Sequence, residues 1–260
     1  GGDYFMLRSI WNSVSAMNAQ QDKLNSISNN LANVSTVGYK SEDVNFQDLM
    51  YETLNRDGYP VNENSPTALI TGSGSKTTEW IRDTSQGSLT ETNKKSNLAI
   101  DGQGFFRVTT PSGQTAYERA GNFNVDSSGR LVDDDGNVVN IESVQVSGNL
   151  NNNNFTINRQ GYVYIREGNQ DRLYGKINIY NVAGQDSMTS IGDNLYTPKQ
   201  GTQIYQNNDA SIYQGYLEQS NVDTGKEMTD MIVSQRAFEL GAKALSTSDD
   251  MWGMINSMRR

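Results

Sequence analysis

The motif Asp101-Gly-Gln-Gly-Phe-Phe106 has the residue types of a phosphate-binding loop. A dinucleotide fingerprint would need a third glycine or alanine three residues after the second glycine of this motif, and then a helix. The corresponding position holds Arg107, and strand-forming residues follow it. We therefore interpret Gly102 and Gly104 as a tight turn that leads into a buried strand.

A second candidate for chemistry is the acidic run Asp133-Asp-Asp-Gly136, followed by Glu142. If Gly136 is the central glycine of a calcium loop, Asp133 and Asp135 occupy ligand positions and Glu142 occupies the last one. The first ligand position would then be Leu131, whose side chain cannot bind a cation. We interpret the run as a hairpin turn and expect no metal site.

Cysteine and histidine are both absent from the 260 residues. Their absence excludes disulfides, thiolate nucleophiles, the usual zinc ligands and a Ser-His-Asp triad. Catalysis by carboxylates or lysine stays formally open. Aspartate and glutamate are scattered along the chain, however, and no pair stands in a context that would raise a pKa. We expect a protein that is not an enzyme and has no cofactor.

The charge balance excludes further classes. The formal net charge is -9, and no basic stripe is present, which argues against nucleic acid and against anionic membranes as partners. Hydrophobic residues make up 35%, with a mean hydropathy of -0.67, as in an extended protein that buries surface only after assembly. We find no run of 18 apolar residues and no cleavable signal pattern. Residues 1–5 do not fit the helical pattern that follows, and we interpret them as a non-native extension before Met6.

The two ends of the chain share a helical pattern. In residues 7–33 and 224–257, apolar side chains recur at alternating steps of three and four, which predicts two amphipathic helices with narrow seams. In the second helix the beat also passes through Gln235, Ala242 and Asp249. A seven-residue beat is typical of a left-handed coiled coil, so we expect the helices to pair in antiparallel fashion. We expect the seam to form an assembly interface from Leu7, Ile10, Val14, Met17, Leu24, Ile27, Leu31, Met228, Met231, Phe238, Leu245 and Trp252.

The middle of the chain has a different pattern. Between about residues 81 and 215, short apolar runs alternate with turn signals at a spacing of about 8–12 residues, which predicts antiparallel strands. The fold class we expect is α+β: paired terminal helices with an inserted all-β domain. Residues 6–35 and 216–260 would form the helical core, 36–80 an extended arm, and 81–215 the β-rich domain. Because the domain is inserted, the chain near Tyr39 and near Leu217 must lie close together.

Four blocks of the sequence resemble one known family, in that family's order. Residues 27–40 closely resemble the N-terminal signature of flagellar rod and hook axial proteins. Residues 86–106, 117–132 and 217–239 continue the resemblance through the central and C-terminal blocks. The matching motif residues are Asn30, Leu31, Ala32, Asn33, Thr36, Gly38, Tyr39, Lys40, Gly102, Gly104, Phe105, Phe106, Ser220, Asn221, Val222, Gln235 and Arg236. One departure is Glu118, before Arg119, where relatives often have threonine.

The resemblance implies a structural subunit of the bacterial flagellum. It implies export by the flagellar type III apparatus without signal cleavage, polymerisation with copies of itself into a rigid, torque-transmitting tube, and a location in the periplasm-spanning rod of the basal body. The implied partners are other copies of the chain, neighbouring rod and hook proteins, and the export apparatus. Length and the central block are most like the distal rod member; a proximal rod or short hook-type member is the alternative. A β-sandwich carbohydrate-binding protein or enzyme is the alternative from another class.

Overall fold

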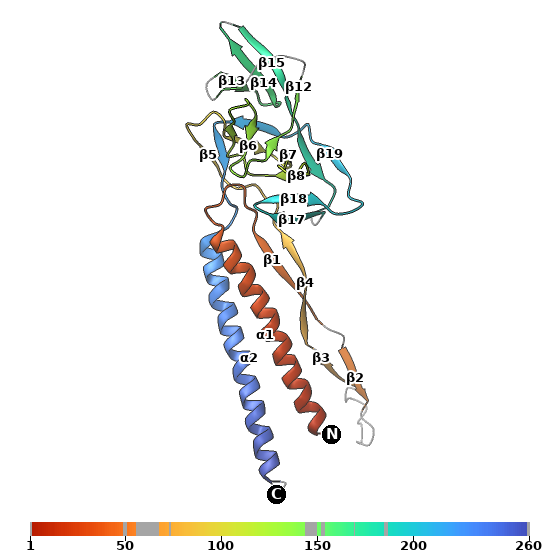
Figure 1. Ribbon diagram of the computed structural model, residues 1–260. Coiled ribbons are helices and arrows are strands. Elements are labelled where there is room, and N and C mark those ends of the chain that lie inside the picture. Colours follow the sequence, from red (N-terminus) through yellow and green to blue (C-terminus); the bar gives the residue numbers. More distant parts are fainter. Residues whose placement is uncertain are drawn as a thin grey trace. The chain divides into compact units, whose positions relative to one another are not determined.

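The computed structural model describes residues 2–48, 51–55, 68–72, 74–143, 150–151, 154–168, 170–184 and 187–258, and the side chains of these except residues 2–9, 48, 51–55, 68–72 and 256. A helix stands at each end of the chain and strands lie between them, so the α+β class is confirmed (Figure 1). The chain divides into two compact units. The helical unit comprises Gly1–Leu31, Glu42–Ile81 and Thr224–Arg260, and the β unit comprises Ala32–Ser41 and Arg82–Asp223.

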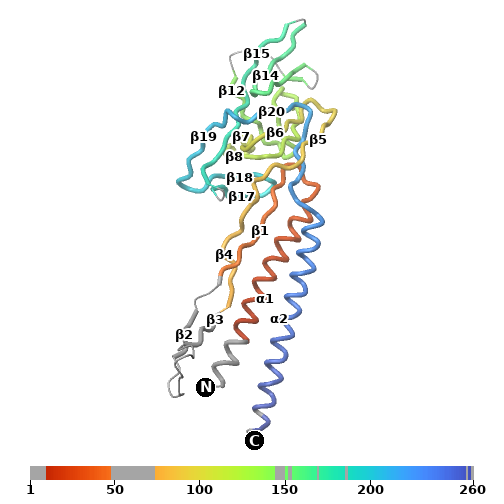
Figure 2. The backbone as a smooth tube through the Cα atoms, turned by 180° about the vertical axis from the view of Figure 1, so that it is seen from behind, coloured from red at the N-terminus to blue at the C-terminus, as the bar shows by residue number. Residues whose placement is uncertain are grey.

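The two helices are α1, Gly2–Ala32, and α2, Thr224–Met258. Figures 1 and 2 show them side by side and running in opposite directions, as the matching seams predicted. Both end within about a residue of the predicted positions, but α1 begins at Gly2 and therefore includes residues 2–5. The interpretation of residues 1–5 as an extension stays a prediction. Within the described residues, no helix is long and apolar enough to cross a membrane.

The packed face of α2 corrects the register that the sequence suggested. Met231, Phe238 and Leu245 are partly buried, as expected. The alternate positions of the beat are Ser234, Gly241 and Ser248, not the exposed Gln235, Ala242 and Asp249. The reason is close approach: a Cβ atom at Gly241 would lie 2.8 Å from Met17 Cγ. Small residues let α1 and α2 pack tightly, so the seam is narrower than a search for large apolar residues predicts.

The segment expected as an extended arm forms a strand ribbon in the helical unit. Strand β1 (Glu42–Asp48) pairs with β4 (Ser75–Arg82), and β2 (Tyr51–Asn55) pairs with β3 (Ala68–Gly72). Side chains of α1 hold the ribbon: Asp22 Oδ2 accepts a hydrogen bond of 2.7 Å from Thr77, and Lys23 forms an ion pair with Asp43. Within the predicted arm 36–80, residues 49–50, 56–67 and 73 lie outside the described residues.

The described residues of the β unit form four sheets. The largest has the order β17-β18-β8-β7-β11-β10-β9, with β16 beside β7 and β19 beside β16, and all its pairs are antiparallel. Its strands are β7 (Phe105–Thr109), β8 (Thr115–Glu118), β9 (Asn124–Val125), β10 (Leu131–Val132), β11 (Val138–Val139), β16 (Ile179–Val182), β17 (Met188–Gly192), β18 (Leu195–Pro198) and β19 (Ile204–Gln206).

The second sheet has the order β12-β15-β14-β13, and two further pairs complete the unit. The strands of the second sheet are β12 (Ile141–Ser143), β13 (Phe155–Ile157), β14 (Tyr162–Glu167) and β15 (Gln170–Ile177). The paired strands are β5 (Leu89–Glu91) with β21 (Tyr216–Glu218), and β6 (Leu98–Asp101) with β20 (Ser211–Gln214). Residues 216–218, which we assigned to the helical core, therefore lie in the β unit.

The core of the β unit is apolar and joins its sheets. Phe106 and Phe123 meet edge to face, with ring centroids 5.3 Å apart. Phe155 from the second sheet and Ile212 from β20 belong to the same buried cluster. Leu150, within the polar run 149–154, is also fully buried in this core; residues 149 and 152–153 lie outside the described residues.

Both motifs that suggested chemistry are turns. Gly102 and Gly104 have φ values of 110° and 139°, in the region that favours glycine, and they connect β6 to β7. Residues 133–137 connect β10 to β11, and the Asp133 carboxylate accepts hydrogen bonds from the backbone N–H groups of Asp135 and Asn137. Among the described residues, no group of three or more acidic side chains is placed to hold a metal ion.

Candidate functional site

Three segments that are far apart in the sequence meet at one buried carboxylate in the β unit. Glu218, in β21, is 1% exposed. Its Oε1 accepts a hydrogen bond of 2.5 Å from Lys40 Nζ and one of 2.9 Å from Gly87 N, and its Oε2 accepts one of 2.6 Å from Arg119 Nε. We call Lys40, Arg119 and Glu218 the ion cluster. It fixes the segment after α1 to the segment before α2, as the inserted topology predicted.

The Arg119 guanidinium also organises the glycine turn between β6 and β7. It donates hydrogen bonds of 2.5, 2.7 and 3.0 Å to the carbonyl oxygens of Gly104, Gly102 and Ile100. The positive φ angles turn these carbonyls toward one cation, and a Cβ atom at Gly104 would lie 2.3 Å from Ile179 Cγ2. Glycine is therefore required at position 104 by both backbone angle and space.

Close backbone approach brings the N-terminal motif into the cluster. Gly38 has a φ of 69°, and its N–H donates a hydrogen bond of 2.8 Å to the Glu218 carbonyl. A Cβ atom at Gly38 would lie 2.6 Å from the nitrogen of Ala120. The positive φ at Gly38 turns the chain so that Lys40 reaches Glu218.

The ion cluster has one more positive than negative charge, because two cations share one carboxylate. Burial lowers the pKa of Lys40, and the hydrogen bond and charge of Glu218 only partly restore it. The carbonyl oxygens around Arg119 supply the remaining negative partial charge. Removing one partner from such a cluster leaves an uncompensated buried charge and is strongly destabilising.

In the helical unit, Asn30 has a comparable role. It is buried, and its Oδ1 accepts a hydrogen bond from Glu42 N while its Nδ2 donates to Glu42 O, each at 2.9 Å. The same Nδ2 lies 2.9 Å from Glu227 Oε1, so the residue ties α1 to both β1 and α2. Burial raises the pKa of Glu227, and the bond from Asn30 opposes this shift.

The remaining motif residues fall into two groups. The first group is structural, and within it Tyr39, Phe106 and Val222 are buried. Two local hydrogen bonds hold the turns: Thr36 Oγ1 donates to Asn33 Oδ1, and Val222 N donates to Ser220 Oγ. Asn221 Nδ2 donates to the carbonyl oxygens of Asp83 and Ser85. Phe105 stacks at 5.5 Å from Tyr196, and Leu31 is half-buried. The second group is exposed: Ala32, Gln235 and Arg236, of which Arg236 pairs with Glu239.

The predicted assembly residues also divide by exposure in the single chain. Ile27 is buried, and Ile10, Val14, Met17, Leu24, Leu31, Met231, Phe238 and Leu245 are half-buried. Met228 and Trp252 are exposed, and the side chain of Leu7 lies outside the described residues. Their role between copies of the chain stays a prediction.

Sequence reasoning missed the two residues that connect the motifs, Arg119 and Glu218. Both stand inside blocks that carried the resemblance, but a charged residue next to a strand is usually solvated. Charge balance is the signal that could have found them. A lysine just after a glycine turn and an arginine beside buried aromatics are both expected to be buried, and each then needs a counter-charge.

Comparison with family models places all three segments in one family. Residues 10–40 match the model described as Flagella basal body rod protein, 99–165 match Flagellar hook protein FlgE/F/G D1 domain, and 213–258 match Flagellar basal body rod FlgEFG protein C-terminal. The chain is 37% identical over 261 residues to the flagellar basal-body rod protein FlgG of Buchnera aphidicola from Acyrthosiphon pisum, with 97% of this chain and all of the relative covered.

Two further relatives agree. FlgG of Borreliella burgdorferi is 36% identical and FlgG of Bacillus subtilis 37%, each covering 98% of this chain and the whole relative. This chain belongs to the flagellar basal-body rod protein family. Each matched segment of the family contributes one member of the ion cluster, namely Lys40, Arg119 and Glu218. The family is a structural one, and the ion cluster joins the three matched segments.

Proposed function

We propose that this chain is a subunit of the distal rod, and that it polymerises into a rigid tube by covering the outward face of α2 with neighbouring copies. The observation that carries the proposal is an apolar face on α2 that the single chain leaves exposed. Ile232 is 60% exposed, Leu240 68% and Met258 80%. Exposed apolar side chains gathered on one face are typical of protein interaction sites.

The helical geometry separates this face from the seam against α1. At 3.6 residues per turn, the buried positions Ser234, Gly241 and Ser248 lie on one side of α2. The exposed apolar side chains lie away from this seam, on the side opposite (Met228, Ile232 and Met254) and along one flank (Val233, Leu240, Met251 and Met258), with Ile255 next to the seam. We call these residues the second face. A helix with one apolar face packed in its own chain and another uncovered is suited to assembly.

Burial of the second face would supply the stiffness that a rod needs. Each large apolar side chain that becomes fully buried contributes roughly 1.5–3 kcal/mol. A contact between different surfaces of identical subunits generates a helical filament when its rotation does not close into a ring. The distal position is supported by full-length similarity to several proteins named FlgG. The proposal includes export by the flagellar type III apparatus without signal cleavage, which membership of an axial family supports.

The test is assembly of the purified chain, followed by electron microscopy and sedimentation. We expect filaments or tubes from the wild type and none from Leu240→Glu, because a charge on the second face cannot be buried unpaired. Ser246→Glu is the matched control: it adds the same charge at an exposed polar position of α2 and should assemble. Circular dichroism of the free chains must show equal helix content. Normal filaments from Leu240→Glu would contradict the proposal.

A further inference from the structure

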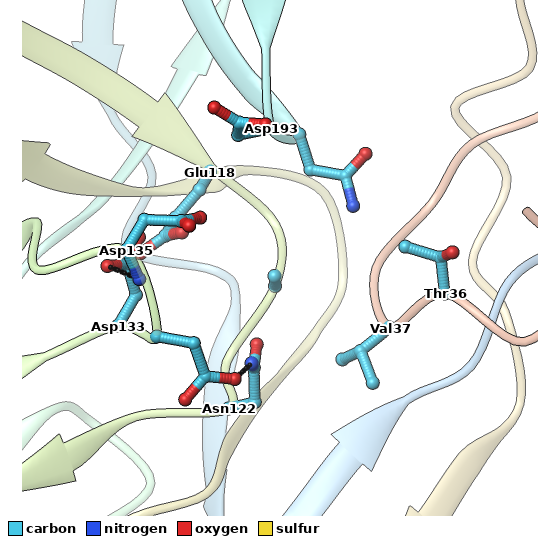
Figure 3. Close-up of a pocket in the computed structure, with 10 residues that line it drawn as sticks. Thr36, Val37, Glu118, Asn122, Asp133, Asp135 and Asp193 are labelled. Atoms are coloured by element: carbon cyan, nitrogen blue, oxygen red, sulfur yellow. Dashed lines mark hydrogen bonds between the residues drawn. The ribbon is translucent and has the colours of Figure 1, made fainter.

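The β unit contains an acidic cavity of about 200 Å³. Figure 3 shows Glu118, Asp133, Asp135 and Asp193 gathered on one side of it, and Thr36 and Val37 facing them. No lysine or arginine is among the described residues that line the cavity. We call it the acidic pocket, and it has no part in the ion cluster.

Glu118 is the unusual member of the acidic pocket. It ends strand β8, is 2% exposed, and its Oε1 has no hydrogen-bond partner. Buried carboxylate oxygens are nearly always paired, because an unpaired one costs the full desolvation of the group. Asp133, by contrast, accepts three hydrogen bonds, from Asp135 N and from the backbone and side chain of Asn137. Asp133 therefore holds the turn, whereas Glu118 is left free to bind something.

The rim of the pocket is built to present charge. Asp193 and Asn194 form the turn between β17 and β18 with positive φ values of 50° and 57°. Asparagine and aspartate tolerate this conformation better than other residues with a side chain. The turn places Asp193 at the pocket, and this residue is exposed in the single chain.

We propose that the acidic pocket receives a lysine or arginine side chain from a second copy of this chain in the polymer. The inference rests on the proposed function, because it names a contact within the assembly. The cavity has about seven times the ~30 Å³ of a water molecule, which suits a long cationic side chain. Metal ions need several carboxylate oxygens within about 2.6 Å, and no described acidic group offers that arrangement.

Glu118 is protonated at neutral pH in the single chain, and a cation in the pocket would change this. Burial and the charges of Asp133 and Asp135 raise its pKa to about 9. An entering cation would stabilise the carboxylate, so the Glu118 carboxyl would release its proton to solvent as the ion pair forms. The added pair would connect β units of neighbouring copies by a contact distinct from the second face of α2.

The first experiment compares the critical concentration for assembly of wild type, Glu118→Gln and Asp193→Asn. We expect both variants to assemble less well, by roughly ten-fold each, the factor that about 1.4 kcal/mol produces. Asp209→Asn is the matched control, since this aspartate is exposed in the same unit and does not line the pocket. Asp193→Asn changes an exposed side chain, so it reports on the pocket independently of the change in stability that Glu118→Gln produces.

The second experiment locates the partner. The chain has no cysteine, so Asn194→Cys gives a single sulfur at the rim for a photo-crosslinker. In mixed labelled and unlabelled polymer, we expect crosslinks to peptides of another copy around one lysine or arginine. Crosslinks within one copy only, or unchanged assembly of both variants, would overturn the pocket proposal while the wild type still polymerises.

Two other outcomes also overturn the pocket proposal. Assembly that a chelator abolishes in wild type but not in Glu118→Gln would identify a metal site instead. A wild type that does not assemble would overturn the proposed function, and the pocket contact with it.

Discussion

At the scale of single residues, the β unit depends on one carboxylate that neutralises two buried cations. Lys40 and Arg119 reach Glu218 from distant parts of the sequence, and each is almost fully buried. Burying a charge is costly unless it is paired and hydrogen-bonded. The cluster therefore makes correct folding of the β unit conditional on the segments that flank both helices.

Replacing Glu218 by glutamine should strongly destabilise the β unit. The amide keeps the shape but has one acceptor oxygen and no charge, so Lys40 and Arg119 stay buried without a counter-charge. We expect a loss of about 3–5 kcal/mol in the free energy of unfolding, measured by urea denaturation. Glu91→Gln, on the paired strand β5 and exposed, is the control and should change stability by less than about 0.5 kcal/mol. A loss below about 1 kcal/mol in Glu218→Gln would contradict the role of the cluster.

Glu118 predicts a pH dependence of stability. Its pKa in the folded chain is about 9, against an ordinary value of 4.5, so between these values the folded state binds more protons than the unfolded state. Its contribution to stability must therefore fall as pH rises through this window. Glu118→Gln removes the effect and should gain on wild type by at most roughly 3 kcal/mol between pH 5 and 7.5. Equal pH profiles of the free energy of unfolding would show that this carboxyl is ionised and solvated.

At the scale of elements, α2 carries two faces with different residue types. The face toward α1 uses small side chains, Ser234, Gly241 and Ser248, between Met231, Phe238 and Leu245. The second face uses large side chains that the single chain does not cover. The apolar periodicity of such a helix arises from both faces together. The sequence therefore placed alternate seam positions one residue away from those that pack against α1.

Two glycines of α2 test the small-residue seam. A Cβ atom at Gly241 would lie 2.8 Å from Met17 Cγ, whereas one at Gly253 would have no atom outside its own helix within 4 Å. Gly241→Val and Gly253→Val change helix propensity equally, so their difference isolates the contact with α1. We expect Gly241→Val to be less stable by roughly 1–3 kcal/mol in thermal unfolding of the helices. Equal stabilities would mean that α1 and α2 do not pack at this position.

The elements themselves were largely predictable from the sequence, and their connections were not. Turn residues such as Gly102 and Gly136 marked the strand ends, because their φ angles are open mainly to glycine. The strands of the 36–80 segment were missed because apolar and polar residues alternate little along them. The ion cluster was missed because its partners are separated by up to 178 positions, and only the folded topology brings them together.

At the scale of the whole molecule, the two units differ in how fully the single chain buries their large apolar side chains. The β unit buries the apolar cluster of Phe106, Phe123 and Phe155 and its own ion cluster within a single chain. The helical unit is incomplete, since α2 leaves large apolar side chains exposed. This difference is what a subunit needs if it is to be folded before assembly and stiff after it.

The most direct test of this account is methionine oxidation measured by mass spectrometry, free and assembled. Met228, Met251, Met254 and Met258 are exposed on α2 in the single chain, and thioether oxidation follows exposure. The account predicts rapid oxidation of these four in the free chain and in Leu240→Glu, and strong protection in the wild-type polymer. Met17, half-buried against α2, should react slowly in every case. Equal oxidation of the four methionines in free and polymerised wild type would contradict the account, because the second face would then take no part in assembly.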